Sequence, residues 1–73
     1  MVEKRPGKSV GAKLARTLCA QFGGVRDPAL EALHPAGSRH TVYLLDDGRV
    51  VDVFLKSARL YASEEELRQD LEG

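Results

Sequence analysis

The chain has 73 residues, of which 42% are hydrophobic and only 5% aromatic, and its 11 basic side chains balance 11 acidic ones. A chain of this length forms one small domain rather than two. It holds a single Cys and no Cys/His cluster at metal-ligand spacing, so we expect neither a disulfide framework nor a metal site. No apolar run approaches the roughly 18 residues of a membrane span. We therefore expect a cytoplasmic protein without a membrane partner.

Charge is divided unevenly along the chain. Seven bases and three acids precede His40, a local balance of +4, whereas the remainder carries four bases and eight acids, a balance of −4. Such a dipolar chain can orient on a charged protein surface, whereas a dedicated DNA-binding protein usually has a strong net positive charge. Two ordinary solvated faces would leave the same pattern.

The first eight residues are predicted to form a tail outside the domain. Residues 1–8 are mostly polar and include Pro6 and Gly7. We expect a flexible basic tail there and a single domain over residues 9–73.

An amphipathic helix is predicted over residues 10–22. Ser9 is the expected N-cap, and Gly23-Gly24 provide a left-handed exit. Cys19 lies on the apolar side, where we interpret it as a small hydrophobe rather than a nucleophile. One side carries Val10, Leu14, Leu18 and Phe22 at a spacing of four, and the other carries Lys13, Arg16, Thr17 and Gln21.

Two further helical segments are short. Asp27-Pro28 is an N-cap followed by a proline at the first helical position, and His34-Pro35 ends the helical turn that follows. Ser63-Glu64-Glu65-Glu66 is a capping box that opens a final short helix. Leu67 and Leu71 lie on one face of that helix.

Between these segments the period changes to two. Residues 40–45 and 50–55 are β-rich runs, which predict an antiparallel hairpin. If Asp47-Gly48 forms a two-residue turn, Val42 and Leu44 share one face with Val51, Val53 and Leu55. The outward face then carries Thr41, Tyr43, Leu45, Val50, Asp52 and Phe54. Two alternatives stay open for this face: it is exposed, or the terminal helix covers it.

Residues 58–61 are either a third short strand or an extended connection. The fold class that follows is α+β: an N-terminal amphipathic helix, an antiparallel β-hairpin with or without a third strand, and a short C-terminal helix, with the helices packed on one face.

No arrangement of reactive side chains is apparent. His34 and His40 lie in or beside loops, have no carboxylate at a spacing that suggests a relay, and are interpreted as ordinary solvated histidines. Asp46-Asp47 before a glycine is what a hairpin turn requires. Gly23-Gly24 lacks the spacing of a phosphate-binding loop. We therefore predict no catalytic residue, cofactor, metal or small-molecule substrate, and a protein that is not an enzyme.

A binding module remains, with two candidate surfaces. The first is the basic tail with the polar side of the first helix, and the second is the outward face of the hairpin, whose exposed apolar side chains are suited to docking. The predicted partner-binding residues are Lys4, Arg5, Lys8, Lys13, Arg16, Tyr43 and Phe54.

In size and organisation the chain resembles the small transcription regulators of lytic Xanthomonas phage that bind host RNA polymerase. The resemblance covers a basic start, one well-marked helix, a hairpin and a short acidic end, without a diagnostic motif. It implies binding to the N-terminal part of the polymerase β′ subunit near the β flap, in the host bacterial cytoplasm. It further implies inhibition of initiation through disturbed σ-factor engagement with the promoter, and antitermination during elongation.

Two alternatives stay open. One is a nucleic-acid-binding accessory protein that uses the basic residues, although the aromatics of single-strand binders and a helix-turn-helix pattern are missing. The other is an antitoxin or anti-defence protein that neutralises another protein through the same surfaces. The oligomeric state is also open, because an exposed hairpin edge can pair with its own copy.

Overall fold

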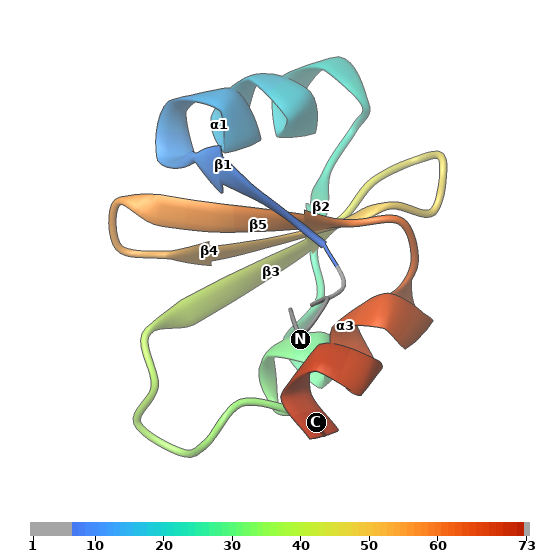
Figure 1. Cartoon of the computed structure of the whole chain (residues 1–73). Helices are drawn as coiled ribbons and strands as arrows, with labels where there is room; N and C mark the ends of the chain where they lie inside the picture. The colour runs from blue at the N-terminus through green and yellow to red at the C-terminus, as the bar shows by residue number, and fades with distance from the viewer. Residues whose placement is uncertain (1–6, 73) are drawn as a thin grey trace, which may run out of the picture.

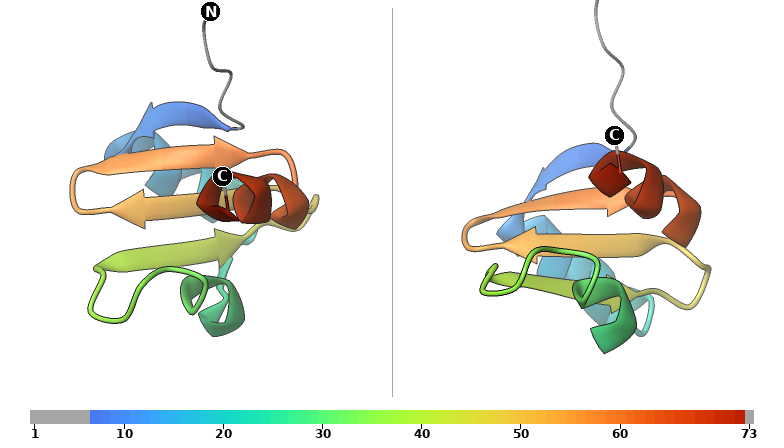
Figure 2. Two further views of the ribbon diagram at one scale, coloured as in Figure 1. Left: turned by 60° about the horizontal axis from the view of Figure 1, so that its bottom comes forward. Right: turned by 90° about the horizontal axis from the view of Figure 1, so that it is seen from below.

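A computed structural model describes residues 7–72 and places them in three layers (Figure 1). The middle layer is a five-stranded sheet with the strand order β1-β5-β4-β3-β2, in which all neighbouring strands are antiparallel. Helix α1 covers one face, and helices α2 and α3 lie against the other (Figure 2). The elements are β1 (Lys8–Gly11), α1 (Ala12–Gln21), β2 (Val25–Arg26), α2 (Pro28–Glu31), β3 (His40–Leu44), β4 (Val50–Phe54), β5 (Ser57–Tyr61) and α3 (Glu64–Glu72).

The five-stranded sheet corrects the expected fold class. Helix and sheet are both present, but the predicted hairpin with helices on one face is wrong, because the sheet has three further strands and helices on both faces. The alternative left open for residues 58–61 is resolved as a strand, β5. Both faces of the hairpin strands are apolar because both are buried, whereas strict alternation is typical of a sheet with one solvated face.

The first helix is shorter than predicted at its start. Val10 lies in β1 and packs beneath α1 instead of opening the helix. The N-cap is Gly11, so no side chain caps the helix and the expected Ser9 cap is wrong. One apolar residue at the right spacing cannot distinguish the end of a strand from the first turn of a helix. The predicted exit is confirmed, since Gly23 adopts a φ of +62°.

Both short helices begin at the predicted side-chain caps. The carboxylate of Asp27 accepts hydrogen bonds from two backbone N–H groups of α2, at 3.0 and 3.2 Å. The Ser63 hydroxyl accepts from the Glu66 N–H at 3.4 Å, and the Glu66 carboxylate accepts from the N–H just before Ser63 at 3.0 Å. Leu67 and Leu71 then pack into the core.

The loop between β3 and β4 is one residue longer than predicted. The Leu45 N–H donates to the Arg49 carbonyl at 2.8 Å, and the Gly48 N–H donates to the Leu45 carbonyl at 3.0 Å, which closes a three-residue loop. Gly48 has a φ of +91°, the left-handed conformation that such loops need at their last position. Asp52 therefore lies opposite Val42, one residue away from the predicted register.

This shift moves every β4 side chain to the other face of the sheet. The predicted outward face is consequently not one surface: Tyr43 packs beneath α1, whereas Phe54 lies on the opposite face. Leu45 and Val50, expected on that outward face, are buried. The core beneath α1 contains Ala15, Leu45, Val51 and Ala58, and the core beneath α2 and α3 contains Leu30, Val42, Val50, Tyr61 and Leu67.

A buried tyrosine of the sheet forms a hydrogen bond to α3. Tyr61 of β5 is only 2% exposed, and its hydroxyl donates to a carboxylate oxygen of Asp70 in α3 at 2.6 Å. Burial, followed by the hydrogen bond to Asp70, raises the pKa of the Tyr61 phenol above its ordinary value. The hydroxyl therefore remains a donor throughout the physiological pH range.

We predict that Tyr61→Phe lowers the free energy of unfolding by about 1–2 kcal/mol, because it removes a hydrogen bond to a charged group and keeps the ring. The matched control Tyr43→Phe removes a hydroxyl that bonds no other residue within 7–72, and its effect should stay below about 0.5 kcal/mol. Urea unfolding followed by circular dichroism measures both. Equal losses in the two variants would show that the bond to Asp70 does not anchor α3.

Candidate functional site

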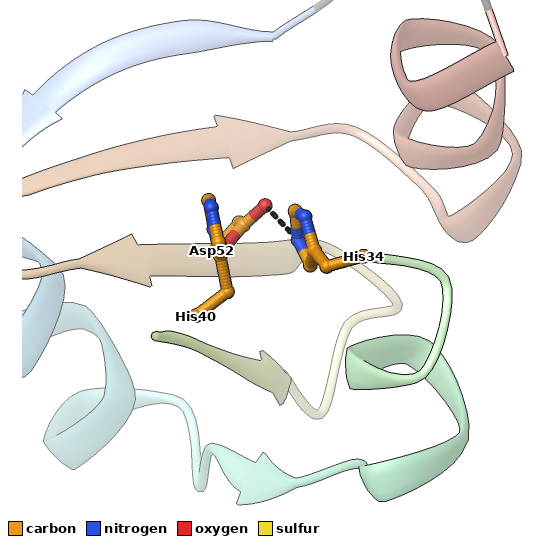
Figure 3. Close-up of side chains that lie close together, drawn as sticks. All are labelled: His34, His40 and Asp52. Atoms are coloured by element: carbon orange, nitrogen blue, oxygen red, sulfur yellow. Dashed lines mark hydrogen bonds and ion pairs between the residues drawn. The ribbon is translucent and has the colours of Figure 1, made fainter. Parts of the chain in front are cut away.

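A buried carboxylate on the central strand joins two imidazole rings (Figure 3). Asp52 is 6% exposed and accepts one hydrogen bond at each carboxylate oxygen, from His34 Nε2–H at 2.8 Å and from His40 Nδ1–H at 2.9 Å. An ionised carboxylate only accepts hydrogen bonds, so the proton of each bond belongs to the ring nitrogen. With Asp52 ionised, the two contacts place a proton on Nε2 of His34 and on Nδ1 of His40.

The β3–β4 register brings His40 and Asp52 to the same face. His40 lies directly opposite Phe54, and Asp52 is the next residue of β4 on that face, within reach as a diagonal neighbour. In the predicted register Asp52 would have projected from the other face of the sheet.

His34 lies three residues beyond the end of α2, and the position of α2 brings its ring to Asp52. Its backbone N–H donates to the Glu31 carbonyl at 3.1 Å, which continues the helical turn beyond the helix. Glu31 itself is held by Arg26, whose Nε and Nη2 lie 2.7 and 3.0 Å from the carboxylate, and by the Val42 N–H at 3.3 Å. The hydrogen bonds from Arg26 are the main reason why the pKa of the Glu31 carboxyl is lowered. These contacts fix α2, and with it His34, over the sheet.

The two imidazoles belong to a stack of three rings. The ring centroids of His34 and His40 are 3.6 Å apart with planes 12° from parallel, and those of His40 and Phe54 are 4.6 Å apart with planes 24° from parallel. His34 is buried, whereas Phe54 at the other end is 40% exposed. The stack therefore ends in an aromatic side chain that solvent or a ligand can reach.

The three side chains of the cluster are also the kinds that bind transition metals, and their potential ligand atoms lie within 4.8 Å of one another. An imidazole lone pair lies in the plane of its ring, and a bound metal sits about 2 Å from the nitrogen in that plane. Two nearly parallel planes whose ring centroids are 3.6 Å apart have no such common point. In this arrangement the cluster is a hydrogen-bonded unit and not a chelate.

A cavity of about 280 Å³ lies beside the cluster, on the same face of the sheet. The rings and Asp52 line it together with Arg59 of β5, Ser9 of β1 and Asp70 of α3. Asp52 faces Arg59 across one strand pair, and Arg59 faces Ser9 across the next. The lining of the cavity thus comes from the four strands β1, β3, β4 and β5 and carries both signs of charge.

The structure corrects the interpretation of the two histidines. They are not plain solvated side chains without a carboxylate partner, because Asp52 binds both. The charged residue within the apolar run of β4 was the available signal: a buried carboxylate requires donors. The three residues are separated by 6 and 12 positions, so their meeting depends on the sheet.

The predicted partner-binding residues are not brought together. Lys4 and Arg5 lie outside the described residues, as does most of the predicted tail. Lys8 belongs to β1, and Lys13 and Arg16 are exposed on α1. Tyr43 and Phe54 lie on opposite faces of the sheet. Their role in binding remains a prediction.

Cys19 lies where the helical pattern places it. It packs, partly buried, against the core beneath α1, and burial raises the pKa of its thiol. A raised pKa lowers the fraction of reactive thiolate, which agrees with a packing role.

Comparison of the chain with protein-family models, curated proteins and solved structures finds no match in any of the three. Within residues 7–72, no helix has both the length and the apolar content needed to cross a membrane.

We predict that long-range ¹H–¹⁵N spectra in alkaline solution, where free imidazole is neutral, show His34 protonated at Nε2 and His40 at Nδ1. Asp52→Asn, which offers one acceptor oxygen in place of two, should disturb both assignments. An Nε2–H tautomer at His40 would contradict the described cluster. Stoichiometric Zn²⁺ that shifts both rings together would show that they chelate a metal.

Proposed function

We propose that the protein acts by binding another protein through the turn between β4 and β5. One observation carries this proposal: Leu55, at the tip of the turn, is 63% exposed and has a φ of +56°. It is the only residue other than glycine with a positive φ within 7–72. The left-handed conformation costs a side chain such as leucine about 1–2 kcal/mol.

A glycine would serve the turn better than a leucine. Phe54 pairs with Ser57, so the turn has two central residues, and only Leu55, the first of them, has a positive φ. This is the position that glycine occupies in type II′ turns. The chain instead places an apolar, strained and exposed side chain there, and strain of this kind gathers at functional sites.

Neighbouring side chains extend the apolar tip. Phe54 is also exposed on one side, and Lys56 at the second central position is exposed and charged. An aromatic and an aliphatic side chain beside a cation form a small docking surface, in which the apolar groups supply affinity and the charge supplies orientation.

The partner that the sequence resemblance implies is bacterial RNA polymerase, contacted at the N-terminal part of β′ near the β flap. Binding there would inhibit initiation by disturbing σ-factor engagement and would permit antitermination in elongation. The identity of this partner rests on the resemblance alone. The involvement of the turn rests on Leu55 and is independent of it.

We predict that Leu55→Gly weakens binding to purified Xanthomonas RNA polymerase at least about tenfold, which corresponds to the loss of one buried aliphatic anchor. The same change should keep the free energy of unfolding or raise it by up to about 1 kcal/mol, because glycine adopts the required φ without strain. Surface plasmon resonance with core enzyme and holoenzyme measures the affinity, and in vitro transcription measures the effect on initiation and termination.

Leu14→Gln is the matched control, since Leu14 is an exposed apolar side chain on α1 rather than in the turn. It should leave polymerase binding unchanged. Equal binding by wild type and Leu55→Gly would remove the turn from the interface. No binding of wild type to either form of the polymerase would exclude this partner.

A further inference from the structure

The face of the sheet that carries the ring stack is only partly covered by helices. Helix α3 crosses one end of it, and the half near the β4–β5 turn has no helix above it (Figure 2). The cavity beside the rings lies on this face, with Asp70 of α3 at one side and His34 and His40 at the other. It is a pocket built from four separate segments of the chain.

Two polar side chains in this pocket form no hydrogen bond or ion pair within residues 7–72. Arg59 forms no hydrogen bond or ion pair with another described residue, although it lies beside Asp52 in the sheet. Ser9 is its cross-strand neighbour on β1, and the Ser9 hydroxyl is likewise unpaired within the described chain. A guanidinium next to a hydroxyl is a combination that commonly binds phosphate oxygens.

The same pocket offers an aromatic surface. Phe54 lines it and is held in place by its stacking on His40, which the hydrogen bond to Asp52 fixes in turn. A rigid exposed aromatic side chain on an antiparallel sheet is a usual support for a nucleobase, and stacking of this kind tolerates any base.

Volume and charge limit what the pocket can hold. About 280 Å³ is at the lower end for ligand pockets, which suits one nucleotide unit. Both lining carboxylates already accept hydrogen bonds, Asp52 from the two histidines and Asp70 from Tyr61. The described lining has one guanidinium beside two carboxylates and therefore no surplus of positive charge, so a phosphate group can be held there only by direct contact with Arg59, and additional phosphate groups are repelled.

We propose that this pocket binds a nucleotide, with the base against Phe54 and its phosphate at Arg59 and Ser9. The nucleotide is either a free nucleoside monophosphate or one unit of a single-stranded nucleic acid, since both present the same chemistry. This proposal goes beyond protein binding by the β4–β5 turn, because Leu55 does not line the pocket.

The test is a titration of the full chain with AMP, GMP, CMP, UMP, ATP, inorganic phosphate and a short oligothymidylate, followed by amide chemical shifts. A nucleoside monophosphate should shift the amides around Phe54 and Arg59 and should bind more tightly than ATP or inorganic phosphate. Arg59→Gln should weaken binding at least about tenfold, and Phe54→Leu should weaken it by a comparable factor.

Arg68→Gln is the matched control, because it removes an exposed arginine on α3 that does not line the pocket. It should leave nucleotide binding unchanged, as should Leu55→Gly. Amide spectra of each variant report whether it is folded. Binding of the oligonucleotide alone, lost in Arg59→Gln and Phe54→Leu, would identify a nucleic-acid strand as the source.

Three results would overturn the proposal. The first is the absence of shifts with every nucleotide and the oligonucleotide at millimolar concentration. The second is binding that Arg68→Gln weakens as much as Arg59→Gln, which would indicate non-specific attraction. The third is inorganic phosphate bound as tightly as AMP, which would leave the aromatic stack without a role.

Discussion

The register of the β3–β4 hairpin is the constraint on which the rest of the structure depends. Gly48 closes a three-residue loop, and this loop decides which side chains of β4 lie on which face of the sheet. With this register Val51 enters the core beneath α1, while Val50 enters the core beneath α2 and α3. A shift by one residue would exchange the two sets and leave Asp52 without its donors.

The polar cluster is the most specific consequence of that register. A carboxylate buried to this degree is costly unless its oxygens accept hydrogen bonds, and Asp52 accepts one at each oxygen. His40 comes from the neighbouring strand and His34 from the segment after α2, so the cluster ties three parts of the chain together. It also orders the ring stack that ends at Phe54. Arg59 and Ser9 line the pocket on this same face of the sheet. The β4–β5 turn with Leu55 lies at the end of this face that no helix covers (Figure 2).

Much of the local structure could be predicted from the sequence, because its causes are local. The caps at Asp27 and Ser63, the exit at Gly23 and the positions of the hairpin strands follow from residue types and spacing. The strand β1 could not be predicted in the same way. It is a four-residue edge strand that pairs with β5, and only that non-local partner distinguishes it from the start of a helix.

Less of the candidate site could be predicted from the sequence. A turn containing Asp-Gly is compatible with a loop of two or of three residues, and each choice gives a different pair of faces. The two-residue choice separates His40 from Asp52 and places Tyr43 and Phe54 together, whereas the structure does the reverse. A charged residue in an apolar strand indicates that a partner is needed, but the identity of the partner depends on the register.

The register itself is the most direct test of this account. In the described hairpin Val42 and Asp52 form a pair without mutual backbone hydrogen bonds, so their α-protons lie close together. Nuclear Overhauser spectra of the full chain should show a strong contact between these two α-protons. A strong contact between the α-protons of Tyr43 and Asp52, which form the corresponding pair in the register of a two-residue turn, would contradict the register, and with it the cluster, the ring stack and the pocket.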